Sequence, residues 1–258
     1  MTLLVVVIES LLSILSPLLI GLAINDLLED SYQGIYTLAA MGAVSLLIGS
    51  LRRFYDTRVY SGIYRTIAGD MVDSEQRKGS NVSAISARTG LINEFVEFME
   101  NSMPEVVGAF VGLVGILVII AGLNLQVFLA CLALLVLILV TYSLTGRLNY
   151  RLNAGYNDQL ERQVAELQSG KRQRIAAHFK QLMHWNIKLS DLETLNYFVI
   201  FVGVIALLLF TPITVIDSGV LKYGLIFAIL MYVFDYTENL LGMPIYIQQL
   251  IRLKEISQ

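Results

Sequence analysis

The sequence predicts an all-α integral membrane protein with six transmembrane helices, and three observations lead to this fold class. Of 258 residues, 56% are hydrophobic and only 15% are charged, whereas soluble domains carry about 25% charged residues. Six apolar stretches are long enough to cross about 30 Å of hydrocarbon. Lysine and arginine are concentrated between these stretches, on one predicted side of the membrane. This composition excludes an ordinary soluble domain and gives no support to nucleic-acid binding.

Two kinds of connection separate the expected spans. The connections after the first, third and fifth spans are short, whereas after the second and fourth spans the helical pattern continues without proline, from Tyr36 to Lys78 and from Gln126 to Gln168. Each run predicts one helix of roughly 65 Å, about twice the bilayer thickness. The breakers KGSN at 78–81 and SGK at 169–171 then turn the chain back. The six spans are expected at 3–28, 35–55, 105–122, 125–146, 195–216 and 222–243.

The basic residues predict the orientation of these spans. If the N-terminus is cytoplasmic, Lys222 is the one basic residue outside, and the other 17 of the 18 lysines and arginines lie on or toward the cytoplasmic side. Cytoplasmic loops of membrane proteins carry such an excess. The N-terminus is apolar from its start and shows no basic region or cleavage site, so we interpret it as the first span rather than a signal peptide. Both termini and both long hairpins are therefore expected in the cytoplasm.

With this layout the chain resembles, over essentially its whole length, the transmembrane domain of ABC exporters, a six-span fold whose second to fifth helices extend far into the cytoplasm. The resemblance is carried by the layout and by three stretches: SILSPLLIGLAINDLL in the first span, residues 87–140 across the third and fourth spans, and the final IYIQQLIRLKEISQ. It implies one six-span domain over residues 1–258. It also implies a domain-swapped homodimer around one substrate pathway, in which the fourth and fifth helices reach across to the partner.

The ATPase part of such exporters has no counterpart in this sequence. No stretch matches G-x-x-x-x-G-K-[ST], because SGKRQ at 169–173 has Arg172 where Ser or Thr would hold magnesium. We therefore expect no nucleotide-binding domain, no enzymatic activity and no cofactor. Both hairpin tips read as tight turns, with little room for the transverse coupling helix on which the family docks its ATPase. A transverse helix at 79–90 or 168–180 would instead favour an ATPase on a separate chain.

A gradient is the other energy source to consider, because proton-driven peptide importers of bacterial inner membranes share the exporter fold without ATPase domains, and this chain looks similar in architecture. Ion-coupled transport uses ionisable groups inside the membrane. Asp235 and Glu238 lie roughly 20 and 24 Å down the sixth span at 1.5 Å per residue. Four more charged residues fall at similar depths in other spans. They are Glu9, Glu105, Arg52 and Arg53, so acids outnumber arginines in this layer. The alternative is a purely structural ion pair of Asp235 or Glu238 with Arg52 or Arg53.

Helical phase indicates which way these acids face. Met231, Asp235, Glu238, Gly242 and Gln249 fall on one stripe of the sixth span. A charge facing lipid costs several kcal/mol, so the stripe is expected to face a cavity or a partner subunit. Four nearby tyrosines could offer hydroxyl donors and aromatic surface to a substrate, or be ordinary packing and interfacial residues. They are Tyr55, Tyr60, Tyr232 and Tyr236.

From these features we expect a homodimeric, proton-coupled secondary transporter of a small amphipathic or cationic solute or peptide, in the bacterial inner membrane. Two alternatives stay open: a membrane subunit of an ATP-driven exporter whose ATPase is a separate chain, and a membrane scaffold that transports nothing. The expected partners are a second copy, membrane lipids and, in the first alternative, an ATPase subunit. No metal site is expected, because a spacing of six places His178 and His184 on different helical faces.

Overall fold

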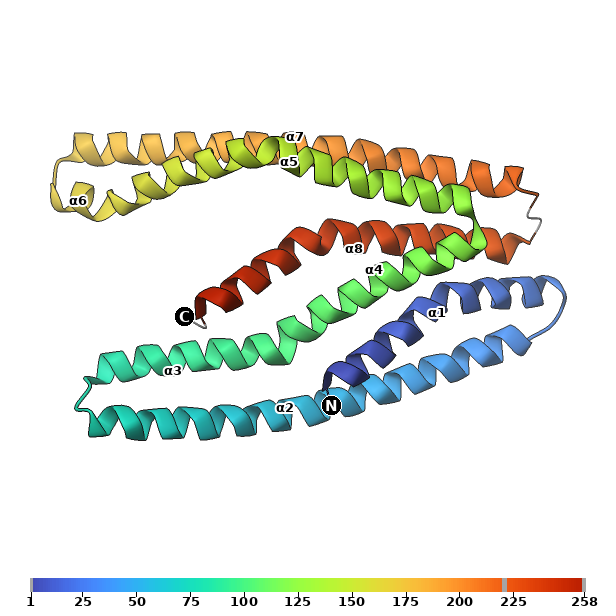
Figure 1. The fold of residues 1–258 in the computed structure, drawn as a ribbon, viewed down its shortest axis with the longest axis horizontal. Helices are drawn as coiled ribbons and strands as arrows, with labels where there is room; N and C mark the ends of the chain where they lie inside the picture. Colours follow the sequence, from blue (N-terminus) through green and yellow to red (C-terminus); the bar gives the residue numbers. More distant parts are fainter. Residues whose placement is uncertain (1, 220–221, 257–258) are drawn as a thin grey trace. The chain divides into compact units, whose positions relative to one another are not determined.

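The computed structural model describes residues 2–219 and 222–256, and their side chains except at 247–248 and 251–256. These residues form eight α-helices and one π-helical turn, with no strand among them (Figure 1). The all-α prediction is confirmed. The elements in order are α1 (Thr2–Leu28), α2 (Gln33–Arg77), α3 (Val82–Glu97), η1 (Phe98–Ser102), α4 (Met103–Leu123), α5 (Leu125–Glu161), α6 (Gln163–Gln168), α7 (Arg172–Asp217) and α8 (Tyr223–Ile256).

Six stretches of helix are long and apolar enough to cross a membrane, in the order that the sequence predicts. A lipid interior offers no hydrogen-bond partners to the backbone, so each span must be helical. The second is part of α2, which continues to Arg77 for 45 residues, about 68 Å at 1.5 Å per residue. The third lies in the continuous helical stretch that α3, η1 and α4 form together. The predicted C-terminal helix is α8 up to Ile256, and the last two residues of IYIQQLIRLKEISQ lie outside the described residues.

The first long hairpin turns at residues 78–81, where the sequence has its first breaker. Gly79 has a φ of +74°, a left-handed conformation that glycine adopts without steric cost. Asn81 then caps α3, because its side-chain oxygen accepts a hydrogen bond of 2.8 Å from the Ala84 N–H. Figure 1 shows α2 and α3 side by side behind this turn.

The third span bends where it passes from α3 to α4. Pro104 has no N–H and cannot donate to the carbonyl four residues earlier. The preceding residues form the π-helical turn η1, in which the Met103 N–H donates to the Phe98 carbonyl. Such wide turns are a common cause of helix bends. Figure 1 shows the bend between α3 and α4, and Glu100 and Asn101 lie in the π-helical turn that joins these helices.

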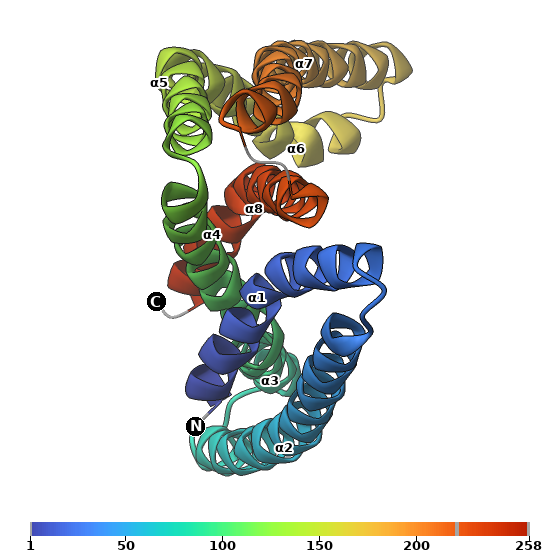
Figure 2. The same ribbon diagram turned by 90° about the vertical axis from the view of Figure 1, so that its right-hand side faces the viewer.

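The chain divides into two compact units. One contains the residues up to Phe128 and those from Thr211 onward, and the other is Leu129–Phe210. In the first unit α1 contacts α2, α4 and α8 (Figure 2). A Cβ on Gly21 would collide with the backbone of Gly224, so glycine permits this close crossing of α1 and α8. Asn25 Oδ1 accepts a hydrogen bond of 2.9 Å from the Gly224 N–H, a donor that the first turn of α8 leaves free.

The second unit is a hairpin of α5 and α7 with α6 at its tip. Leu134 and Leu137 of α5 cover Gly203 of α7, and the Trp185 ring lies against Gly155. The expectation of one uninterrupted helix from 126 to 168 is wrong in one detail, because the helix stops at a turn at Arg162 before α6 begins. After α6, Gly170 turns the chain with a φ of +63°.

Candidate functional site

A polar cavity of about 390 Å³ lies among α1, α4 and α8. Asp235, Glu238 and Asn239 of α8 line it together with Ser10 and Ser13 of α1. The facing side of α4 carries glycines: a Cβ on Gly108 would meet the Ser10 hydroxyl, and one on Gly112 would meet the Asn239 amide. The absence of side chains on α4 therefore brings the polar groups of α1 and α8 close to it, as expected for small residues in membrane helices.

The two carboxylates of this cavity are those of Asp235 and Glu238. Asp235 is half-buried and Glu238 is exposed. Among the residues that the structure describes, neither forms an ion pair with a basic side chain. The Asp235 carbonyl accepts a hydrogen bond of 2.8 Å from Asn239 Nδ2, which fixes the amide beside the acids. Val233 and Leu240 lie off the stripe and are buried, while Asp235 and Glu238 of the stripe line the cavity.

A second cavity, of about 240 Å³, lies among α1, α2, η1 and α4. It contains the other four charged residues that the sequence placed at similar depth. These are Glu9, Arg52, Arg53 and Glu105. Ser10 and Gly108 line both cavities, so the two adjoin each other. The charged layer is thus divided between an acidic cavity and a mixed one.

Arg52 is the centre of an ion-pair network in the second cavity. Its Nε donates to Glu9 Oε2 at 2.6 Å, and its Nη1 donates to Asp56 Oδ2 at 3.2 Å. Thr2 Oγ1 donates to the other oxygen of Asp56 at 2.7 Å. Asp56 is only 1% exposed. Our sequence reasoning missed it, although its position four residues after Arg52 in a helix is the signal for such a pair.

Glu9 is only partly satisfied by Arg52. Its second oxygen, Oε1, is buried and has no hydrogen-bond partner among the described residues. That oxygen lies opposite Gly49, where a Cβ would approach it to 3.2 Å. The glycine therefore makes room for the Glu9 carboxylate on α2.

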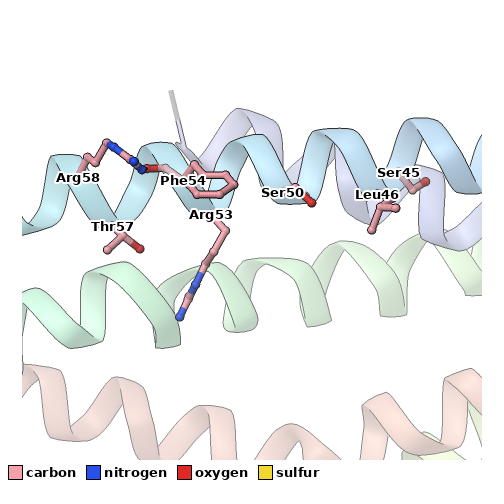
Figure 3. Close-up of a pocket in the computed structure, with 8 residues that line it drawn as sticks. Ser45, Leu46, Ser50, Arg53, Phe54, Thr57 and Arg58 are labelled. Atoms are coloured by element: carbon pink, nitrogen blue, oxygen red, sulfur yellow. The ribbon is translucent and has the colours of Figure 1, made fainter.

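Arg53 and Thr57 tie α2 to the π-helical turn. Arg53 Nη1 donates to Asn101 Oδ1 at 2.8 Å, and Thr57 Oγ1 donates to Glu100 Oε1 at 3.0 Å. Figure 3 shows Arg53 pointing from α2 toward the neighbouring helix. Our sequence reasoning missed Asn101 as a partner because the π-helical turn decides which way its side chain points.

A larger, mostly apolar cavity of about 710 Å³ runs along α2 on the side shown in Figure 3. Leu46, Phe54 and Arg58 line it, and the Arg58 guanidinium lies 5.3 Å from the centre of the Phe54 ring. Leu46 and Phe54 make this side of α2 apolar. Both of these side chains are more than 60% exposed, as expected of a helix face that lipid or another chain covers.

The structure therefore gives both arginines partners other than the acids of α8. Arg52 pairs with Glu9 and Asp56, and Arg53 binds Asn101. Asp235 and Glu238 face a different cavity. Glu105 lines the second cavity from α4, is exposed, and forms no ion pair among the described residues.

The four tyrosines considered for a substrate pathway lie in two environments. Tyr232 and Tyr236 on α8 are fully buried, and the Tyr232 hydroxyl donates a hydrogen bond of 2.8 Å to the Ile14 carbonyl. This bond joins α8 to α1. Tyr55 is exposed and Tyr60 is partly exposed on α2. None of the four lines the two polar cavities.

Within residues 2–219 and 222–256, no three His, Cys, Asp or Glu side chains are close enough together to hold a metal ion. Comparison with known families gives one match: a model described as the ABC transporter transmembrane region covers residues 1–222. The match covers the unit Leu129–Phe210 completely and the other unit only in part, because it ends before α8, which carries Asp235 and Glu238. No curated protein matches the chain.

Proposed function

Because the chain belongs to the family of ABC transporter transmembrane regions, we propose that it moves a solute across a membrane as a homodimer and that a proton gradient drives the movement. The orientation that we propose places both termini and both long hairpins in the cytoplasm of a bacterium, on the basis of the positive-inside pattern. The solute is small and either cationic or amphipathic, since the cavity among α1, α4 and α8 carries two acids.

The observation that carries this proposal is the pair of acids in the 390 Å³ cavity. Asp235 and Glu238 lie beside the hydroxyls of Ser10 and Ser13 and the Asn239 amide, and no basic side chain that the structure describes lines this cavity. An ionisable group inside a membrane is costly and marks a functional site by default. A carboxylate that no arginine holds is free to exchange its charge for a proton or for a cationic solute.

The Arg52 network supports a separate role for the mixed cavity. Three helical positions, Glu9, Arg52 and Asp56, hold one another by charge-assisted hydrogen bonds. This arrangement joins α1 to α2, and its one guanidinium is shared by two carboxylates. We assign it to the stability of the helix packing, and we assign proton coupling to the acids of α8.

The family favours a second candidate function, the membrane subunit of an ATP-driven transporter whose ATPase is another chain. The first hairpin has four residues between α2 and α3, and α3 runs directly back along α2. At the second tip, α6 is a separate helix of six residues. A docked ATPase would have to contact these short tips, and ATP would then be required for transport.

The proposal is tested in proteoliposomes with ethidium as a fluorescent cationic probe and an imposed pH gradient. We expect gradient-driven ethidium movement that falls at least tenfold, about 1.4 kcal/mol, in Asp235→Asn and in Glu238→Gln. Asp70→Asn is the matched control, because Asp70 is an exposed acid on α2 outside the expected span. Movement that needs ATP and an added ATPase chain would support the second candidate instead.

A substrate-independent measurement accompanies this assay. Dicyclohexylcarbodiimide modifies protonated carboxyl groups in apolar surroundings, and mass spectrometry locates the modified residue. We expect modification on α8 at Asp235 or Glu238 that declines between pH 6 and pH 9. If neither residue is modified at any pH in this range, both acids stay ionised and the proton-coupling proposal fails.

A further inference from the structure

A separate polar cavity lies at the tip of the hairpin formed by α5 and α7. Its volume is about 320 Å³, and it lies wholly within the unit Leu129–Phe210. It begins about 20 Å beyond the end of the apolar stretch 125–146 at 1.5 Å per residue, so it lies beyond the expected membrane-spanning part of α5. Its lining comes from three helices and the turn between two of them. The residues are Gln159, Arg162, Glu166, Arg174, Ala177 and His178.

His178 lines this cavity from α7 and is held by Gln159. The residue is only 4% exposed, and Gln159 Nε2 lies 2.9 Å from its Nδ1. An amide nitrogen can only donate, so with the amide in this orientation Nδ1 accepts and the ring proton is on Nε2. Nε2 is buried and has no hydrogen-bond partner among the described residues. Because Nε2 has almost no exposed surface, His178 forms part of the cavity wall, and the donors that a ligand can reach belong to the arginines of the lining.

Two arginines add positive charge beside His178. Glu166 accepts two hydrogen bonds of 3.0 Å each from Arg174, through Nε and one terminal nitrogen, which fixes the guanidinium in place. Arg162, at the turn between α5 and α6, forms no ion pair among the described residues. With the histidine neutral, two arginines and one glutamate leave a net charge of +1 in the lining.

We propose that this cavity binds a small oxyanion, with a phosphoryl group as its ligand chemistry. A phosphoryl group offers several acceptor oxygens, which suits the planar, permanently charged donors of Arg162 and Arg174. The distance from the apolar stretch favours a free phosphate or phosphorylated solute over a lipid headgroup. The turn at Arg162 is what brings an unpaired arginine to this point, so the helix break that the sequence pattern did not predict builds the site.

The test uses the full chain in phosphatidylcholine nanodiscs, with inorganic phosphate as the probe and calorimetry as the readout. Trp185, the sole tryptophan, lies against Gly155 in the same hairpin, so its emission reports whether the hairpin is intact. We expect saturable binding of one phosphate per chain. Arg162→Gln is expected to weaken it at least tenfold, with unchanged Trp185 emission because Arg162 is exposed.

Arg174→Gln is the second variant, and it is expected to lose binding because it removes the second guanidinium of the lining. Arg172→Gln is the matched control: Arg172 is exposed at the same tip but does not line the cavity, so binding should stay within about twofold. An equal loss in Arg172→Gln would mean unspecific charge attraction and would overturn the proposal, as would the absence of saturable binding to the natural chain. Displacement of phosphate by an equal concentration of acetate would overturn the phosphoryl preference. Loss of the phosphate signal in nanodiscs that contain phosphatidic acid would identify a lipid headgroup as the ligand instead of a free solute.

Discussion

Asp56 shows how a buried charge is accommodated next to a membrane span. The residue is 1% exposed, and its carboxylate receives hydrogen bonds from Arg52 and Thr2. Arg52 also binds Glu9, and both of these side chains are about one-fifth exposed. The two carboxylates therefore depend on one guanidinium. Removing it would leave two carboxylates close together without compensation, and breaking a buried pair costs much more than the pair itself contributes.

We accordingly predict that Arg52→Gln lowers the free energy of unfolding by about 3 kcal/mol, measured by denaturant titration in micelles. Asp56→Asn in the same chain should restore part of this loss, because the double variant no longer buries an unpaired carboxylate there. Arg53→Gln is the control, since Arg53 is exposed and binds the neutral Asn101, and its loss should be below about 1 kcal/mol. Equal losses at 52 and 53 would contradict the network.

At the scale of elements, the first hairpin tip is held by one acid, Glu75, in the last turns of α2. Ser80 Oγ donates to one of its oxygens at 2.7 Å, and Lys78 Nζ lies 3.1 Å from the other. Arg88 of α3 forms an ion pair with the same carboxylate. Glu75 lies about 30 Å beyond the expected span 35–55 at 1.5 Å per residue, so water surrounds this tip.

These contacts of Glu75 predict that the hairpin tip is sensitive to acid. The Ser80 hydrogen bond, followed by the Lys78 hydrogen bond and the charges of Arg88 and Lys78, lowers the pKa of Glu75 below its ordinary value of 4.5. A lowered pKa in the folded state means that the contribution is complete above pH 4.5 and is lost as the pH falls through the lowered value. We expect hydrogen exchange at 78–82, corrected for intrinsic rates, to speed up in that acid range.

Glu75→Gln should open the same residues already at pH 7 and remove their acid dependence, whereas Asp73→Asn should change neither, because Asp73 is exposed. If hydrogen exchange at 78–82, corrected for intrinsic rates, is fast and independent of pH in the natural chain, Glu75 does not hold the tip.

At the scale of the whole molecule, the distribution of basic residues sets the expected orientation. Ser31 lies in the short connection after α1, and Ser169 lies at the tip of the second long hairpin. The native thiol, Cys131, is fully buried and contributes little background labelling. In intact bacterial spheroplasts, a membrane-impermeant maleimide should label Ser31→Cys and spare Ser169→Cys until the membrane is opened with detergent. The reverse pattern would invert the proposed topology.

Much of the fold could be predicted because its causes are local. A helix in lipid must satisfy its own backbone, so apolar runs of about 20 residues specify spans one at a time. Glycine in the two breakers specifies the turns in the same way. The break at Arg162 was not predictable, because its flanking residues are ordinary helix formers and contain neither proline nor glycine.

The charged layer separates what the sequence by itself determined from what only the tertiary structure decided. The sequence determined that six charged residues lie at similar depths and that Asp235 and Glu238 share one side of their helix, since depth and phase follow from position along a helix. Only the tertiary structure decided that Arg52 binds Glu9 and Asp56 while the acids of α8 face their own cavity. The physical reason is that ion pairs depend on which helices are neighbours, and that depends on close approaches such as Gly112 to Asn239 and Gly21 to Gly224, which involve residues far apart in the chain.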